Sequence, residues 1–167
     1  MVLGTILCVL VAVLLVAPRI LSQPASSEES AATENPVEMG GVSVADGDGP
    51  LMCSNPSGFA QSSRIWDCGG TRIMARSEST PDDEERALAR VYRAAVWDRS
   101  VDLDGIEQPC DGVRVKRNGA SGDGAFVAVS VLDDASTRYF TIGGPDADEM
   151  ADRVVAAAPE EMKVGAQ

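Results

Sequence analysis

The chain has 167 residues and a formal net charge of −12, because 26 Asp and Glu outnumber 14 Lys and Arg. A surface of that sign repels phosphate backbones, so we expect no binding to nucleic acid. Histidine is absent, which excludes a Ser-His-Asp or Cys-His catalytic arrangement, a histidine-ligated zinc site and imidazole pH sensing within this chain.

The chain opens with an apolar run, residues 1–17, that contains no charged side chain and is followed by Pro18 and Arg19. A helix of this length measures about 25 Å, and a few more residues bring it close to the ~30 Å hydrocarbon core of a bilayer. We therefore predict a transmembrane anchor over 1–21. Two alternatives stay open: a cleaved signal peptide with a weak site after Ser22, and a buried core helix.

The signals for membrane orientation disagree. Arg19, the cation that flanks the apolar run, would place the following domain in the cytoplasm by the positive-inside tendency. The cysteines and the acidic region that follow favour the other side. We expect a single-pass protein of the cell membrane with its domain on the extracytoplasmic side. Cys8 does not indicate a lipoprotein, because Leu7 stands where the lipoprotein signal needs a small residue.

Residues 22–50 are rich in Ser, Ala, Glu, Gly and Pro, contain no aromatic residue, and have one clear apolar cluster at 42–44. So little apolar surface does not offset the conformational entropy of an ordered chain. The composition therefore predicts a disordered acidic linker, with an acidic docking segment as the alternative. We place an extracytoplasmic domain at 51–160 and a flexible tail at 161–167.

The first half of this domain contains two predicted strands and a helix. Alternating apolar and polar residues predict short strands over 62–67 and 71–77, forming a hairpin or two sheet edges. Thr80 and Pro81, followed by acidic residues, are typical of a helix start with Thr80 as the cap. The helix is expected to run to residue 100.

The second half predicts an antiparallel meander followed by a second helix. Strands are expected over 113–116, 126–132 and 138–142, and 126–132 is apolar on both faces, as in a central strand. A helix is expected to open at Asp146, with Glu149 at capping-box spacing. Together these elements predict an α+β fold, a small antiparallel sheet with two helices packed on one face. The larger core side chains are expected to be Trp66, Tyr92, Trp97, Phe126 and Phe140.

Three cysteines of the predicted domain permit one disulfide and one free thiol. Cys53 and Cys68 are closest in sequence, and their bridge would close a loop of about 15 residues worth roughly 3 kcal/mol in the chain-entropy model. We predict this pair, with Cys110 as the alternative partner. No cofactor or metal site is expected. The acidic residues Asp102 and Asp104 lack the spacing and glycine of a calcium loop.

These residues assemble no recognisable catalytic group, so we predict a binding or assembly domain rather than an enzyme. Its partners would be the membrane, through 1–21, and a membrane or envelope protein of a bacterial complex in which it is an accessory subunit. The partner surface is expected on the sheet face left open by the helices, at Arg72, Arg76, Arg114, Lys116 and Arg138. Alternatives are a cleaved, secreted small-ligand-binding or thiol-redox protein, and a hydrolase with a carboxylate pair.

Overall fold

The computed structural model describes residues 33–54, 62–97, 99–120, 122–133 and 136–159. The predicted anchor over 1–21 and the predicted tail over 161–167 lie outside these ranges. Within them, no helix has both the length and the apolar character needed to cross a membrane.

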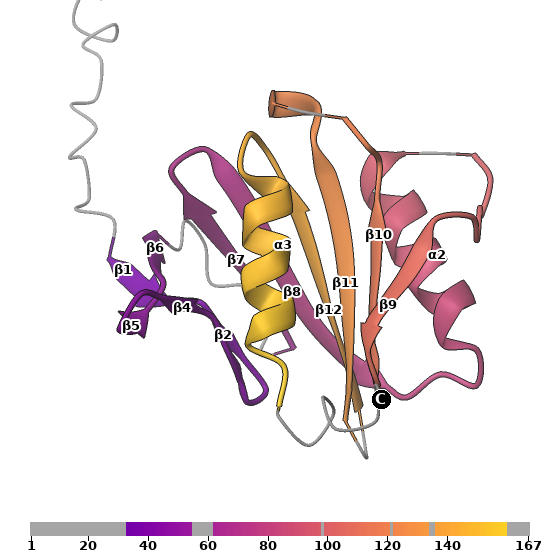
Figure 1. Cartoon of the computed structure of the whole chain (residues 1–167), viewed down its shortest axis with the longest axis horizontal. Coiled ribbons are helices and arrows are strands. Elements are labelled where there is room, and N and C mark those ends of the chain that lie inside the picture. The colour runs from indigo at the N-terminus through magenta and orange to yellow at the C-terminus, as the bar shows by residue number, and fades with distance from the viewer. Residues whose placement is uncertain (1–32, 55–61, 98, 121, 134–135, 160–167) are drawn as a thin grey trace, which may run out of the picture. The chain divides into compact units, whose positions relative to one another are not determined.

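The described residues form one large antiparallel sheet with two α-helices (Figure 1). This confirms the α+β class. The strand order across the sheet is β1–β6–β7–β8–β12–β11–β10–β9. These strands span Glu34–Pro36 (β1), Met52–Ser54 (β6), Ser63–Cys68 (β7), Thr71–Ser79 (β8), Ser136–Gly143 (β12), Phe126–Asp133 (β11), Val113–Arg117 (β10) and Ile106–Cys110 (β9). The helices are α2 (Glu84–Val96) and α3 (Ala147–Ala156), and a 3-10 turn, η1, covers Gly122–Gly124.

The two helices lie on opposite faces of the sheet, so the prediction that both pack on one face is wrong. Leu88 of α2 packs in one cluster with Ala128 and Tyr139. The helix α3 belongs to the main core, which holds Val129 and Phe140, the strand positions next to those two. Since successive side chains of a strand point to opposite faces, the two clusters lie on opposite sides. Figure 1 shows α3 in front of the sheet and α2 behind it.

The reason is the two-sided apolar character of the central strands. In β11, residues 127–131 are buried at every position, and in β12 residues 137–142 are as well. One layer of helix covers one face only, so a strand pair that is apolar on both faces needs a layer on each side. We name the two sides the α2 face and the α3 face.

The predicted linker is wrong for residues 33–50, which fold into short strands and contribute to the main core. Besides β1, this region holds β2 (Glu38–Met39), β3 (Val42–Ser43), β4 (Ala45–Asp46) and β5 (Gly49–Pro50). Val37 donates its N–H to the Leu51 carbonyl, Leu51 donates to Val44, and Val44 donates to Val37, at 2.8–3.0 Å. The three backbone hydrogen bonds form a closed ring, and the side chains of all three residues are buried in the core. The folded unit therefore begins well before residue 51.

Both helices begin differently from the expectation. The strand β8 continues to Ser79, paired with Ser136, so α2 starts only at Glu84 and Asp83 caps it by accepting the N–H of Arg86. Asp146 stands at the N-cap of α3, but its side chain makes no capping hydrogen bond; its own N–H donates to the Thr71 hydroxyl at 3.1 Å. Helix α3 is thus positioned by the sheet rather than by a capping box.

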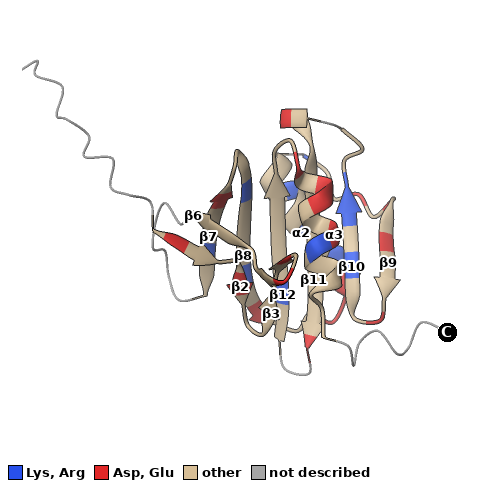
Figure 2. Cartoon of the chain, turned by 60° about the vertical axis from the view of Figure 1, so that its left-hand side comes forward, with Lys and Arg blue, Asp and Glu red and all other residues tan. Residues whose placement is uncertain are grey.

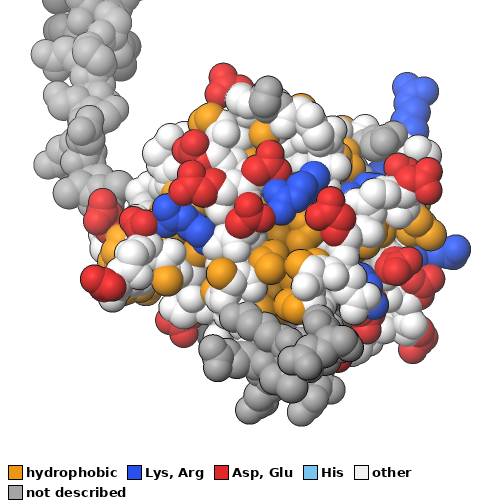
Figure 3. Space-filling model, viewed as in Figure 1, with side chains coloured by type: hydrophobic (Ala, Val, Ile, Leu, Met, Phe, Trp, Pro, Cys, Tyr) orange, Lys and Arg blue, Asp and Glu red, His pale blue; other side chains and the backbone are white. Residues whose placement is uncertain are grey.

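Ion pairs hold α3 at both of its sides. Arg117 of β10 contacts Asp148 and Asp152, each at 2.7 Å, and Arg153 contacts Asp46 of the β4–β5 hairpin at 2.6 Å. The space-filling view from the α3 face shows basic side chains set among acidic ones (Figure 3). Such partly exposed pairs each contribute modestly, but together they fix the helix between the sheet and the N-terminal hairpins.

Cys53 and Cys68 form the predicted disulfide. They stand on the neighbouring strands β6 and β7, with their Cα atoms 4.9 Å apart. The indole N–H of Trp66, a fully buried side chain, donates to the Pro36 carbonyl of β1 at 3.1 Å. The disulfide and this hydrogen bond join the short strands at this edge of the sheet to the long ones.

We expect the double substitution Cys53→Ala and Cys68→Ala to lower the free energy of unfolding by about 3 kcal/mol, because a closed loop of about 15 residues is opened in the unfolded chain. Urea unfolding with and without reductant measures this. Reductant should lower the stability of the native protein by a similar amount and leave that of the double variant unchanged. A reductant-sensitive double variant would contradict the assignment of this pair.

Candidate binding surface

The helix α2 covers only part of the sheet on its side. It packs on β10, β11 and β12, whereas the α2 face of β8 is left accessible among the described residues. Along β8, Arg72, Met74 and Arg76 alternate onto this face, and Met74 is 39% exposed. The uncovered part of the face thus carries one apolar side chain between two cations.

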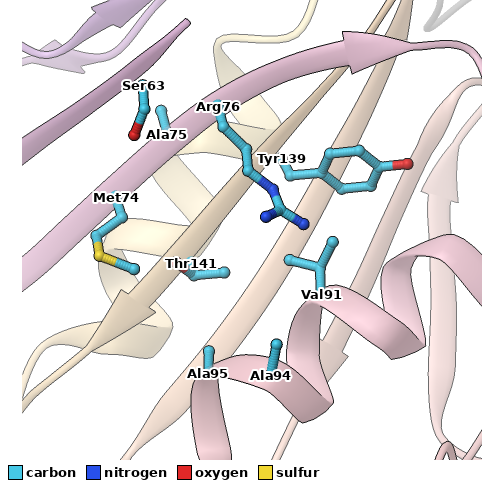
Figure 4. Close-up of a pocket in the computed structure, with 9 residues that line it drawn as sticks. All are labelled: Ser63, Met74, Ala75, Arg76, Val91, Ala94, Ala95, Tyr139 and Thr141. Atoms are coloured by element: carbon cyan, nitrogen blue, oxygen red, sulfur yellow. The ribbon is translucent and has the colours of Figure 1, made fainter. Parts of the chain in front are cut away.

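A groove runs between α2 and this part of the sheet. Leu88 and Val91 seat the first turns of α2 on the sheet, but Ala94 and Ala95 are too short to fill the space beneath the last turns. The resulting hollow has a volume of about 220 Å³ (Figure 4). Its lining residues are Ser63, Met74, Ala75, Arg76, Val91, Ala94, Ala95, Tyr139 and Thr141.

Arg76 and Tyr139 form the polar side of the groove. The guanidinium of Arg76 lies 5.7 Å from the centroid of the Tyr139 ring and pairs with Glu78 at 3.1 Å. Nearly half of the Arg76 side chain is exposed, so it stays available to a partner. Burial raises the pKa of Tyr139, and the carboxylate of Glu78 adds to the effect. The groove is therefore lined here by an exposed cation over the face of a buried tyrosine ring, whose hydroxyl points away from Met74 and Ala95 (Figure 4).

The five residues of the predicted partner surface are not brought together. Arg72 and Arg76 lie on the uncovered part of the α2 face. Arg114 pairs with Glu84 at the start of α2, and Lys116 is buried beneath the same helix, against the Tyr92 ring. Arg138 lies on the α3 face. Figure 2 shows basic residues distributed over several strands rather than on one surface.

Arg138 fastens the N-terminal hairpin to the sheet. It is 8% exposed and pairs with Asp133 at 2.6 Å. Its guanidinium also lies against Gly40, in the turn between β2 and β3, where a Cβ would collide with it. Gly40 has a φ of 55°, a conformation that glycine adopts without strain. Arg138 therefore has a structural role, since it joins the β2–β3 turn to the sheet.

Lys116 fastens the segment that follows α2. Its ammonium donates to the Asp104 carbonyl and lies 3.4 Å from the Asp102 carboxylate. The N–H of Asp104 lowers the pKa of Asp102, and Lys116 lowers it further. The negative charge of the Asp102 carboxylate is therefore partly balanced by Lys116 of the same chain. Among the described residues, no group of three His, Cys, Asp or Glu side chains is placed to hold a metal ion.

Trp97, expected in the core, is instead 91% exposed. It ends α2 in the left-handed conformation, with φ 57° and ψ 30°, and its N–H donates to the Arg93 carbonyl. This position usually holds glycine. The helix ends at Val96, four residues before the predicted end, so Trp97 leaves the helical spacing that would have directed its side chain toward the sheet.

Comparisons with protein-family models, with curated proteins and with solved structures found no match for this chain. Its function is therefore inferred from its own residues and their arrangement.

We expect Tyr139→Phe to remove part of the loss of stability in alkali. Because the pKa of Tyr139 is raised on folding, the unfolded chain releases the phenolic proton first, and the free energy of unfolding falls as pH rises above about 10. Below about pH 10 this residue adds no pH dependence to the free energy of unfolding. Urea unfolding between pH 8 and pH 11 measures the effect. Tyr92→Phe, which leaves Tyr139 in place, should keep the fall, and an unchanged slope in Tyr139→Phe would contradict the account.

We expect Trp97→Gly to raise the free energy of unfolding by up to about 1 kcal/mol, because glycine adopts the left-handed conformation without strain and the exposed indole contributes no burial. Ala94→Gly, inside the same helix, is the matched control and should lower it by about 1 kcal/mol. Urea unfolding of both variants measures the two opposite signs. A stability loss in Trp97→Gly would show that Trp97 is supported by contacts within the domain.

Proposed function

We propose that this chain is a membrane-anchored binding domain on the extracytoplasmic side, an accessory subunit that docks a segment of a membrane or envelope protein into the groove beside α2. The groove is the observation that carries the proposal. It combines an apolar wall, an exposed methionine and an available cation on one open sheet face.

The chemistry of the groove indicates the kind of segment it fits. Met74, Ala94 and Ala95 offer apolar contacts, and Arg72 and Arg76 border them with positive charge. The chain as a whole is strongly acidic, with a net charge of −12. A partner segment with an apolar side chain and a neighbouring carboxylate would be attracted here and repelled from most of the remaining surface. The volume of the groove is smaller than that of typical drug-sized pockets, which favours the binding of one side chain over that of a whole small molecule.

Two features support the location. The apolar run 1–17 has the composition of a membrane-spanning or exported segment. The disulfide between Cys53 and Cys68 fits an oxidising compartment, since such bridges rarely persist in the cytosol. Both agree with a domain held outside the cytoplasm.

The proposal is tested by site-specific photocrosslinking in cells that express the full chain. A photoreactive residue at Met74 should give one discrete adduct with a membrane protein, and Arg76→Glu should weaken that adduct severalfold because it reverses the charge at the groove. The same residue at Asp111, exposed in the β9–β10 turn, is the control and should give no such adduct. Equal adducts from both positions would overturn the assignment of the groove.

Location is tested on the same cells by the mass of the chain after alkylation. Of its four cysteines, Cys53 and Cys68 should react only after reduction, and the chain should be recovered with membranes and with its N-terminus intact. Alkylation of all four without reductant would place the domain in a reducing compartment. A mass beginning near Gln23 would instead support the secreted alternative.

A further inference from the structure

The uncovered part of the α2 face lies inside the sheet rather than at one of its edges. Along residues 72–76, β8 pairs with β7 on one side and with β12 on the other. Its backbone N–H and C=O groups are therefore engaged within the sheet. A partner that lies on this face obtains side-chain contacts from β8 but no backbone hydrogen bonds.

This constraint determines which backbone conformation suits the partner segment. Docking removes part of that segment from water, and each buried N–H or C=O group then needs a hydrogen bond. An extended segment would find these bonds at a sheet edge, which β8 does not provide. A helix makes them within itself and presents only its side chains to the sheet.

We propose that the segment docked in the groove is an amphipathic helix that lies along β8, next to α2. This helix rests on the proposed function, which places a segment of a membrane or envelope protein in the same groove. The geometry of the face adds the conformation of that segment and the pattern of its side chains.

The width of the uncovered part fits such a helix. The helix α2 packs on β10, β11 and β12, so β11 is the middle strand beneath it. In the strand order β8 lies two positions from β11, a separation of about 10 Å. Packed helices are also about 8–10 Å apart, so a helix above β8 would contact the sheet and α2 together.

Small side chains on α2 leave room at this contact. Ala94 and Ala95 line the hollow of about 220 Å³ together with Met74 of β8 (Figure 4). Because the alanine side chains are short, one apolar side chain of the partner helix can enter between α2 and the strand. The partner helix would thus complete the cover of this face in the way that α2 covers the rest of it.

The charges on β8 set the pattern of the helix. Arg72 and Arg76 are exposed on either side of Met74, and four strand residues place them about 13 Å apart. Two helical turns, from position i to i+7, cover about 11 Å on one helix face, and the long side chains span the difference. We expect carboxylates at i and i+7, with the apolar residue at i+3 or i+4. The exposed pair between Arg76 and Glu78 is weak, so a partner carboxylate can replace Glu78.

The test identifies which partner residues face two positions of this surface. Ser63 and Asp67 of β7 stand beside Arg76 and Arg72 in the register, so a photoreactive residue at either one leaves both arginines in place. Each variant of the full chain is crosslinked in cells, and mass spectrometry locates the attached partner residue. A helix advances about 1.5 Å per residue and a strand about 3.3 Å. We therefore expect the two attachment sites about seven to nine residues apart in the partner, with the Met74 site between them.

Charge reversal tests the pairing of the arginines with carboxylates. Arg72→Glu should weaken the Met74 adduct severalfold, and a change of the facing partner carboxylate to lysine should restore it. Arg64→Glu is the matched control. Arg64 is also exposed, but it lies on the α3 face of β7, opposite the core residue Ala75, so its reversal should leave the adduct unchanged. An equal loss in both variants would overturn the pairing.

The spacing of the attachment sites separates this inference from the proposed function. Sites about four residues apart would indicate an extended segment. That result would overturn the helix, and the proposed function would stand. If the Met74 variant gives no adduct with a membrane protein, the proposed function fails, and the helix fails with it.

Discussion

The strands β11 and β12 are buried on both faces, and this requirement determines how the other elements are layered around them. Their residues pair in continuous register, and side chains on both sides must be removed from water. A helix on each face is the consequence, and so are the contributions of Val37 and Val44 to the α3 side, where α3 shares the cover with the N-terminal hairpins. The groove has the same origin, because one short helix on the α2 face leaves β8 only partly covered.

The N-terminal hairpins show how an acidic, glycine-rich stretch is ordered without a long strand. Val37, Val44 and Leu51 stand seven residues apart, and each pair is joined by one backbone hydrogen bond. Each intervening segment is free to be polar and to turn at glycines, because the three spaced residues supply the burial. Composition averaged over residues 22–50 hides this pattern, whereas the spacing of the apolar residues carries it.

Sequence reasoning was sufficient where one local signal decides the outcome. The cysteine pair, both helices as elements and the meander through residues 113–142 are predictable from spacing and period. It is insufficient where a strand and a helix compete for the same residues, or where contacts between residues distant in sequence determine the structure. The strand β8 extends to Ser79 because Ser136 pairs with it, and this delays the start of α2. Residues 126–132 are apolar on both faces, and this pattern calls for a helix on each side of the sheet rather than two helices on one side.

The distribution of cations shows why the binding surface could not be predicted by counting arginines. Three cations make contacts within the domain itself. Arg114 pairs with Glu84 at the start of α2, Lys116 donates to the carbonyl of Asp104 in the segment after α2, and Arg138 lies against Gly40 in the β2–β3 turn. Each of the three is largely buried and paired, because an unpaired charge is costly there. The described surface therefore offers apolar side chains beside a few cations, as at Met74, which Arg72 and Arg76 flank on the uncovered part of β8.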